Sequence, residues 1–296
     1  MTKTRPAPPR AGTSRSAGAP STSGVRRRRR AVTLGVVAAV LAGGGYLGAR
    51  QLIDSAVSPE CTISASGITE TFEPDQTGNA ALIAAISMKR EMPARAATIA
   101  LTTAFQESKI RNLRYGDRDS LGLFQQRPSQ GWGTEAEILD PVFATNSFYD
   151  ALVKYKGYET ADITKIAQRV QKSGYPAAYR DHEGQGRVLA STLTGHSPGG
   201  LTCRLDPATT HASPAAVASD LSKQMGVTSA KVGDGALTVT AADATTAWAV
   251  GHWAVARAEQ YGATAVTVGG RTWDRSAHDA TWSSGAAGTT VKITLS

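Results

Sequence analysis

The chain has 296 residues, 41% of them hydrophobic, which suffices for one or two domains with their own cores. Its net charge of +8 comes from the N-terminus, since residues 1–50 contain ten lysines and arginines and no acidic residue. The rest carries 22 basic and 24 acidic side chains, which argues against nucleic-acid binding by the folded part.

The N-terminal residues predict a membrane anchor. Residues 1–30 are rich in Pro, Ser, Gly and Arg and indicate a disordered, basic cytoplasmic arm. Residues 31–49 are uncharged and would span about 28 Å as a helix, close to the hydrocarbon thickness of a bilayer. Because five arginines at 26–30 favour the cytoplasm, we expect a single-pass cell-membrane protein with its main domains outside. A cleaved signal peptide is the alternative, although the apolar run is longer than a usual signal core.

The two cysteines, Cys61 and Cys203, are 142 residues apart and neither belongs to a Cys-x-x-Cys pair. In an oxidising exterior, two lone cysteines at the edges of a domain most simply form a disulfide bond. Two buried free thiols are the alternative.

Residues 58–203 predict a mainly helical domain. An Ala/Ile/Leu-rich segment indicates a helix over 79–90 with Asn79 as N-cap, and Pro93 precedes a helix over 94–108. Apolar spacing predicts further helices over 140–156, 163–173 and 183–193. The glycine-rich residues 111–134 between them indicate a loop.

Residues 215–296 predict a small α+β accessory domain. Residues 196–214 have the composition of a linker, and we place the boundary between the domains at 204–214 within it. The expected elements follow in chain order: a helix over 215–225, a strand over 236–240, a helix over 243–261 that Gly262 ends, and strands over 265–268 and 290–295.

Glu107 is the candidate catalytic residue. It lies at the predicted C-terminal end of a helix, with Phe105 and Phe124 nearby in the sequence. The negative end of the helix dipole and apolar burial both disfavour a carboxylate, so both would raise the pKa of Glu107 and favour a general acid. A solvated glutamate at a helix end is the alternative from physical reasoning alone.

Two elements carry a family resemblance. Glu107-Ser108, followed by Gly122-Leu123-Phe124-Gln125, resembles the signature of the soluble lytic transglycosylase family and, more widely, the lysozyme-like superfamily. The longer segment 116–133 resembles a version found in exported actinobacterial proteins, and the resemblance covers about residues 78–195. It implies a mainly α, lysozyme-like domain that binds peptidoglycan glycan strands and cleaves their MurNAc-GlcNAc β-1,4 bond without a cofactor.

The resemblance also implies roles for single residues. Glu107 would protonate the glycosidic oxygen and then deprotonate the sugar 6-hydroxyl, which yields a 1,6-anhydro product without a second carboxylate. Ser108 would orient Glu107. Gln125, and with less support Gln126, would offer amide contacts to the sugar.

The sequence departs from the family pattern after the signature. An Ala-Tyr-Asn-Ala-Gly element is missing, and residues 167–176 stand in its place. Gln171 and Tyr175 are the substitutes that we expect to bind substrate there. Either Asp117 or, as the preferred candidate, Asp119 could position a water molecule, which would make the protein a hydrolytic lysozyme, but both also suit a turn. Trp132 could stack on a sugar ring or anchor its own glycine-rich loop.

Other features bear on partners and on rival functions. The five histidines show no metal-binding spacing, so we predict no metal site. A catalytically silent, wall-binding scaffold is the main rival to an enzyme. Four of the five tryptophans lie in the C-terminal region, where they suit a sugar or a cell-wall protein partner, and equally a small hydrophobic core: Trp248, Trp253, Trp273 and Trp282.

Overall fold

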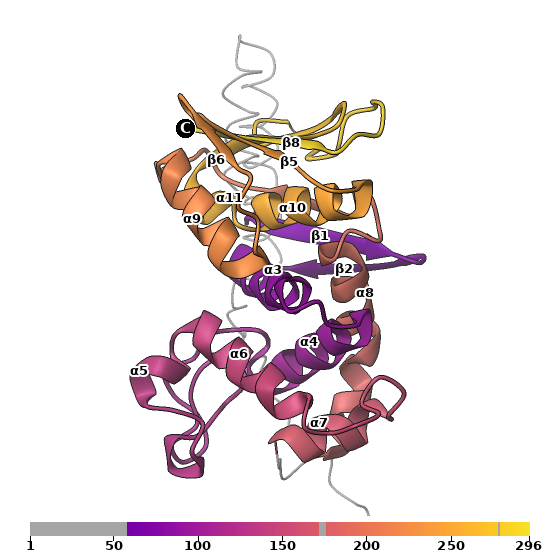
Figure 1. Ribbon diagram of the computed structural model, residues 1–296, viewed down its shortest axis with the longest axis vertical. Coiled ribbons are helices and arrows are strands. Elements are labelled where there is room, and N and C mark those ends of the chain that lie inside the picture. Colours follow the sequence, from indigo (N-terminus) through magenta and orange to yellow (C-terminus); the bar gives the residue numbers. More distant parts are fainter. Residues whose placement is uncertain (1–57, 172–175, 278) are drawn as a thin grey trace, which may run out of the picture. The chain divides into compact units, whose positions relative to one another are not determined.

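The computed structural model describes residues 58–171, 176–277 and 279–296 (Figure 1). The predicted cytoplasmic arm, the predicted anchor at 31–49 and Tyr175 lie outside the described residues. In the part that the structure describes, no helix combines the length and apolarity that crossing a bilayer needs. The fold is mixed, with helices and two small antiparallel sheets.

The first sheet joins the two ends of the predicted first domain. Its strands are arranged antiparallel in the order β2-β1-β3: β1 (Glu60–Ala65), β2 (Ile68–Phe72) and β3 (Leu201–Arg204). Ser66 and Gly67 connect β1 to β2, and both have the positive φ angles of a tight hairpin turn, 53° and 78°. These strands are not evident from the sequence, because each has only four to six residues and β2 does not alternate clearly between buried and exposed positions.

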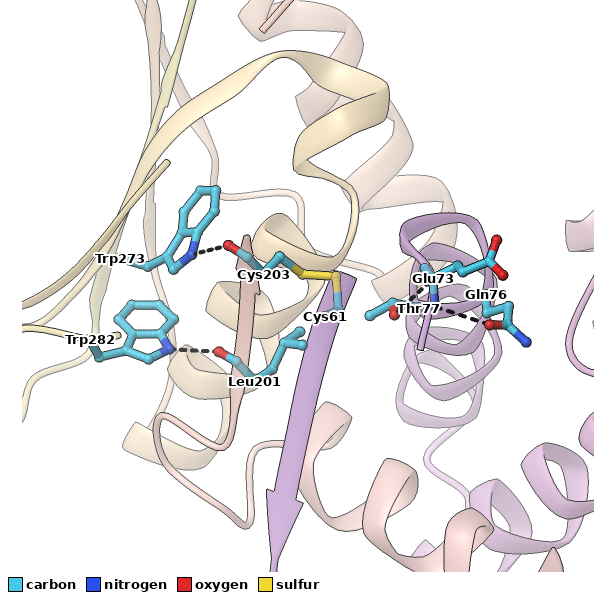
Figure 2. The surroundings of a disulfide bond; sticks show 8 residues. All are labelled: Cys61, Glu73, Gln76, Thr77, Leu201, Cys203, Trp273 and Trp282. Atoms are coloured by element: carbon cyan, nitrogen blue, oxygen red, sulfur yellow. Dashed lines mark hydrogen bonds between the residues drawn. A yellow bond between two sulfur atoms is a disulfide. The ribbon is translucent and has the colours of Figure 1, made fainter. Parts of the chain in front are cut away.

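The predicted disulfide bond is confirmed. Cys61 and Cys203 face each other in the register of β1 and β3, with a Cα–Cα distance of 4.0 Å, and both side chains are buried (Figure 2). The Cys203 carbonyl accepts a hydrogen bond from the indole N–H of Trp273 at 3.0 Å. The disulfide bond therefore links the start of the domain to its last strand.

The helices of this region pack around α4. They are α3 (Pro74–Lys89), α4 (Ala94–Ser108), α5 (Glu135–Ile138), α6 (Pro141–Leu152), α7 (Ile163–Gln171) and α8 (Glu183–Leu193), with 3-10 turns η1 (Pro128–Gln130) and η2 (Pro176–His182). Helices α4 and α8 approach each other closely, since a Cβ atom at Gly186 would lie 2.1 Å from Oγ1 of Thr102. Glycine at this position thus allows α8 to lie directly against the helix that carries Glu107.

The bounds predicted for α4 and α8 are confirmed, while those of α3 and α6 need correction. Helix α3 begins at Pro74, where the main-chain N–H of Glu73 donates to Oε1 of Gln76 at 3.0 Å (Figure 2). Asn79 is therefore inside the helix and not its N-cap. Helix α6 ends at Leu152, four residues earlier than predicted, and the chain continues in turns.

The second sheet lies in the C-terminal region and has the antiparallel strand order β4-β5-β8-β6-β7. The elements here are α9 (Pro214–Met225), β4 (Lys231–Gly233), β5 (Ala236–Thr240), α10 (Ala244–Ala256), α11 (Ala258–Tyr261), β6 (Ala263–Val268), β7 (Arg271–Asp274) and β8 (Thr290–Leu295). Helices α9 and α10 lie beneath the sheet (Figure 1). The single helix predicted over 243–261 is divided at Arg257, whose guanidinium group bonds Tyr261, Gln260 and the carbonyl of Gly78.

The tryptophans of the C-terminal region are core residues. None of the four is more than 8% exposed: Trp248, Trp253, Trp273 and Trp282. Their hydrophobic core is continuous with that of the helices around α4. The predicted linker at 204–214 is thus flanked by residues that share one core.

The buried side chain of His252 should make the folded state less stable in acid. Its ring is fully buried, Nδ1–H donates to the Thr192 carbonyl at 2.7 Å, and Nε2 has no partner among the described residues. Burial, aided by the charge of Arg271, lowers the pKa of His252 from 6.5 to about 4. Between these values the unfolded chain binds a proton that the folded chain excludes. The folded state therefore loses up to about 3 kcal/mol as the pH falls from 6.5 to 4.

We expect denaturant unfolding at pH 7 and pH 4 to show this loss in the wild type, and His252→Phe to reduce it. The control is His211→Gln, which replaces an exposed histidine. It should show the same difference in unfolding free energy between pH 7 and pH 4 as the wild type. An equal acid loss in His252→Phe would contradict the assignment.

Candidate functional site

The end of α4 positions Glu107. The helix terminates because Lys109 and Ile110 both adopt left-handed backbone conformations, with φ of 56° and 58°. Their carbonyl groups accept hydrogen bonds from side chains of α3, Gln76 at 2.8 Å and Asn79 at 2.9 Å. Ile110 is fully buried and β-branched, so its conformation costs energy that the surrounding contacts must offset. The last turn of α4 is therefore rigidly placed.

Ser108 connects this turn to the loop that follows. Its hydroxyl donates to the carbonyl of Leu123 at 2.7 Å and accepts a hydrogen bond from the main-chain N–H of Arg111 at 3.1 Å. Ser108 makes no hydrogen bond to the Glu107 carboxyl group within the described residues. It thus holds the Gly-Leu-Phe-Gln loop against the end of α4 and orients Glu107 only through the main chain.

The loop itself is closed by main-chain hydrogen bonds. Leu121 and Gln126 exchange two bonds of 2.9 and 3.0 Å, and the N–H of Gly122 donates to the Leu113 carbonyl at 2.7 Å. Gly122 has a φ of 75°, and a Cβ atom there would lie 2.7 Å from the carbonyl oxygen of Ile138. The glycine of the motif is therefore required by both conformation and space.

Two donors converge on the carboxyl group of Glu107. The hydroxyl of Tyr179, from η2, donates to Oε1, and the side chain of Gln171, from α7, forms a second hydrogen bond to the same group. Nε2 of Gln171 also donates to the carbonyl of Phe124, so α7 is joined to the loop as well. Three segments distant in sequence thus meet at one half-buried glutamate.

The environment shifts the proton affinity of Glu107 in the direction that a general acid needs. Burial raises the pKa of Glu107, and the hydrogen bonds from Tyr179 and Gln171 lower it in part. The net direction is upward, because the cost of desolvating the charged form exceeds the stabilisation by the two donors. This agrees with the pKa direction predicted from the sequence.

The two glutamines of the loop have structural contacts. Nε2 of Gln125 lies 3.3 Å from the carbonyls of Tyr115 and Gly122, so its amide supports the loop. Gln126 is 1% exposed and donates to the carbonyl of Ala144 at 3.1 Å. Gln126 therefore lies in the core, out of reach of a substrate, while Gln125 is partly accessible.

Asp119 belongs to a separate cluster. Its carboxylate accepts hydrogen bonds from Nε of Arg127 at 2.6 Å and from the main-chain N–H of Ser129 at 2.8 Å. The contacts with Ser129 and Arg127 hold the pKa of Asp119 well below its usual range. A carboxylate so strongly stabilised in its charged form is a weak general base.

The remaining sequence-predicted residues are placed differently. Trp132 is half-buried and lines a hollow beside α6. Glu107 is not among the residues that line this hollow. Tyr179 was not predicted, because its contact with Glu107 spans 72 residues and no local spacing marks it. The tyrosine expected on the far wall was instead Tyr175, which lies outside the described residues.

The described residues contain no group of three His, Cys, Asp or Glu side chains that could hold a metal ion. No protein-family model matches the chain, and a comparison with curated proteins found no significant match.

Proposed function

We propose that the protein is a membrane-anchored lytic transglycosylase that cleaves the MurNAc-GlcNAc β-1,4 bond of peptidoglycan with Glu107 as its only acid and base. The observation that carries this proposal is a half-buried glutamate with a raised pKa, held by Tyr179 and Gln171 at the end of a rigid helix. The lysozyme-like character of the domain is part of the proposal.

The chemistry proceeds in two steps. Glu107, protonated, donates its proton to the glycosidic oxygen as the C1–O bond breaks, and the 2-acetamido oxygen of the muramic acid residue bonds to C1. Glu107, now a carboxylate, then removes the proton of the 6-hydroxyl while O6 attacks C1 and displaces the acetamido oxygen. The product is a 1,6-anhydro sugar, Glu107 is protonated again, and no water molecule is consumed.

Tyr179 and Gln171 can stabilise the Glu107 carboxylate that takes part in the second step. After the first step Glu107 carries a negative charge in a partly buried position, which desolvation disfavours. The hydroxyl and amide donors stabilise this charge and fix the carboxyl group in one orientation. They thereby keep the pKa of Glu107 from rising so far that it would fail as a base.

The contacts of Asp119 favour a transglycosylase over a hydrolase. A hydrolytic mechanism needs a second carboxylate that positions or activates water. Asp119 was the candidate, but its oxygens are bound by Arg127 and Ser129. Its role in this proposal is to brace the loop between Asp119 and Ser129.

The confirmed disulfide supports the proposed location. Disulfide bonds persist in oxidising compartments and are rare in the cytosol, so the bond between Cys61 and Cys203 fits a domain outside the cell membrane. With the apolar residues 31–49 before it, the domain would be held close to the inner surface of the wall.

Product analysis tests the reaction. We expect the full-length protein, incubated with purified peptidoglycan, to release muropeptides with 1,6-anhydro ends, identified by mass spectrometry. Reducing ends would instead show a hydrolase. Binding to peptidoglycan without any released product would show a silent scaffold and overturn the enzymatic proposal.

Tyr179→Phe should shift the pH dependence of the reaction. The variant lacks a donor that stabilises the Glu107 carboxylate, so the pKa of Glu107 rises further. Because the general acid must be protonated, the pH at which activity falls should move upward, and kcat/KM at neutral pH should decrease about tenfold from the loss of a charged hydrogen bond.

Tyr158→Phe is the matched control, since Tyr158 is also largely buried and, within the described residues, is not among the hydrogen-bond partners of Glu107. Its pH profile should coincide with that of the wild type. An unshifted profile in Tyr179→Phe would contradict the role assigned to Tyr179.

A further inference from the structure

A hollow of about 550 Å³ lies on the side of α6, between this helix, the turn after η1 and helix α7. Its size falls within the usual range of small-ligand sites. The residues that line the hollow include Trp132, Ser147, Asp150, Lys154, Tyr155 and Val170. Val170 is adjacent in α7 to Gln171, which contacts Glu107, so one helix serves both places.

Two aromatic side chains form part of the wall. The hydroxyl of Tyr155 donates to the carbonyl of Arg169 at 2.8 Å, which fixes the tyrosine against α7. Trp132 is half-buried, and its indole N–H has no hydrogen-bond partner among the described residues. Trp253, Trp273 and Trp282, by contrast, each donate to a protein oxygen. Trp132 thus combines an apolar face with an unused donor.

Among the described charged residues that line the hollow, Lys154 has no acidic partner. Asp150 forms an ion pair of 2.6 Å with Arg90, which also donates to Oδ1 of Asn146 at 3.1 Å. Lys154, one turn further along the chain, is exposed and has no ion-pair or hydrogen-bond partner in the described part of the chain. The lining therefore presents an unpaired ammonium group next to a neutralised carboxylate.

We propose that this hollow binds the carboxylate of a short peptide, namely the peptide stem of peptidoglycan, with Lys154 as its charged partner. A neutral sugar would use the aromatic wall but would leave the unpaired cation without a role. A peptide carboxylate instead complements the charge of Lys154 and can accept from the indole of Trp132. The apolar side chains of the peptide would pack on Trp132 and Tyr155.

This inference rests on the proposed function for the identity of the ligand, but its test does not depend on catalysis. We would titrate the ¹⁵N-labelled full-length protein with N-acetyl-D-alanyl-D-alanine and with its carboxamide, and follow the indole N–H signals by NMR. The signal of Trp132, assigned by its loss in Trp132→Phe, reports on the hollow itself.

The expected result is that the acid shifts the Trp132 signal and binds at least about tenfold more tightly than the carboxamide, since a charge-assisted hydrogen bond is lost in the amide. Lys154→Gln should weaken binding of the acid by a similar factor. Lys156→Gln removes an equally exposed lysine that does not line the hollow, and it should bind like the wild type.

Three results would overturn the inference: no shift of the Trp132 signal, equal affinity for acid and carboxamide, or equal affinity of wild type and Lys154→Gln. A shift with a peptide-free N-acetylglucosamine tetramer alone would assign the hollow to glycan. If the peptide binds as expected while peptidoglycan yields no anhydro products, the catalytic proposal fails and the peptide site stands.

Discussion

Glu107→Gln is expected to reduce the release of anhydro-muropeptides by at least about 10³-fold, because glutamine can neither donate nor remove the proton that the reaction needs. The measurement is mass-spectrometric quantification of anhydro ends released from peptidoglycan by equal amounts of the two proteins. Glu159→Gln, which changes an exposed glutamate away from the site, should retain wild-type activity.

The Glu107→Gln variant should not be less stable than the wild type. Because burial raises the pKa of Glu107, the folded state holds this proton more tightly than the unfolded state, and stability declines as the pH rises through the raised value. A neutral glutamine avoids that loss. An inactive variant that has also lost its thermal transition would show only unfolding and would leave no support for Glu107 as the catalytic acid.

Removing the disulfide bond should have the largest effect on stability. We expect the double variant Cys61→Ala/Cys203→Ala to lose about 4 kcal/mol of unfolding free energy, since the bond closes a loop of 142 residues and both sulfur atoms are buried. Chemical denaturation followed by circular dichroism measures the difference.

Each single variant should lose a similar amount, because it lacks the same cross-link and its remaining thiol packs as a small apolar side chain. The wild type unfolded and refolded in reductant should resemble the double variant. A loss below about 1 kcal/mol would show that packing of β3 alone holds the two ends of the domain together.

The sequence predicts those elements whose signals are local. Helix α4 follows Pro93, and both α4 and α8 have the bounds that the sequence predicts. Strand β3 is not evident from the sequence because it acquires its partner only through pairing across more than 130 residues, and the hairpin of β1 and β2 is too short to give a clear pattern. The sequence predicts too late a start for helix α3, since its first turn contains polar residues whose capping contacts are not visible as a hydrophobic pattern.

In the candidate site, too, local signals are visible in the sequence and contacts between distant segments are not. Glu107 is predictable because the helix end, the neighbouring aromatic residues and the motif are all close in sequence. Gln171 was proposed from its place after the motif, and the structure brings it to Glu107. Tyr179 and the ion pair of Asp119 with Arg127 depend on how loops fold back, which no periodicity records.

The indole groups beside the disulfide have a consequence for self-association. Strand β3 is at the edge of its sheet, and an exposed edge strand offers unpaired carbonyl groups to the strands of other molecules. Here the outward carbonyls of Leu201 and Cys203 already accept the N–H groups of Trp282 and Trp273, at 2.7 and 3.0 Å (Figure 2). The C-terminal region thus occupies the β3 edge of the small sheet and keeps strands of other molecules from pairing there.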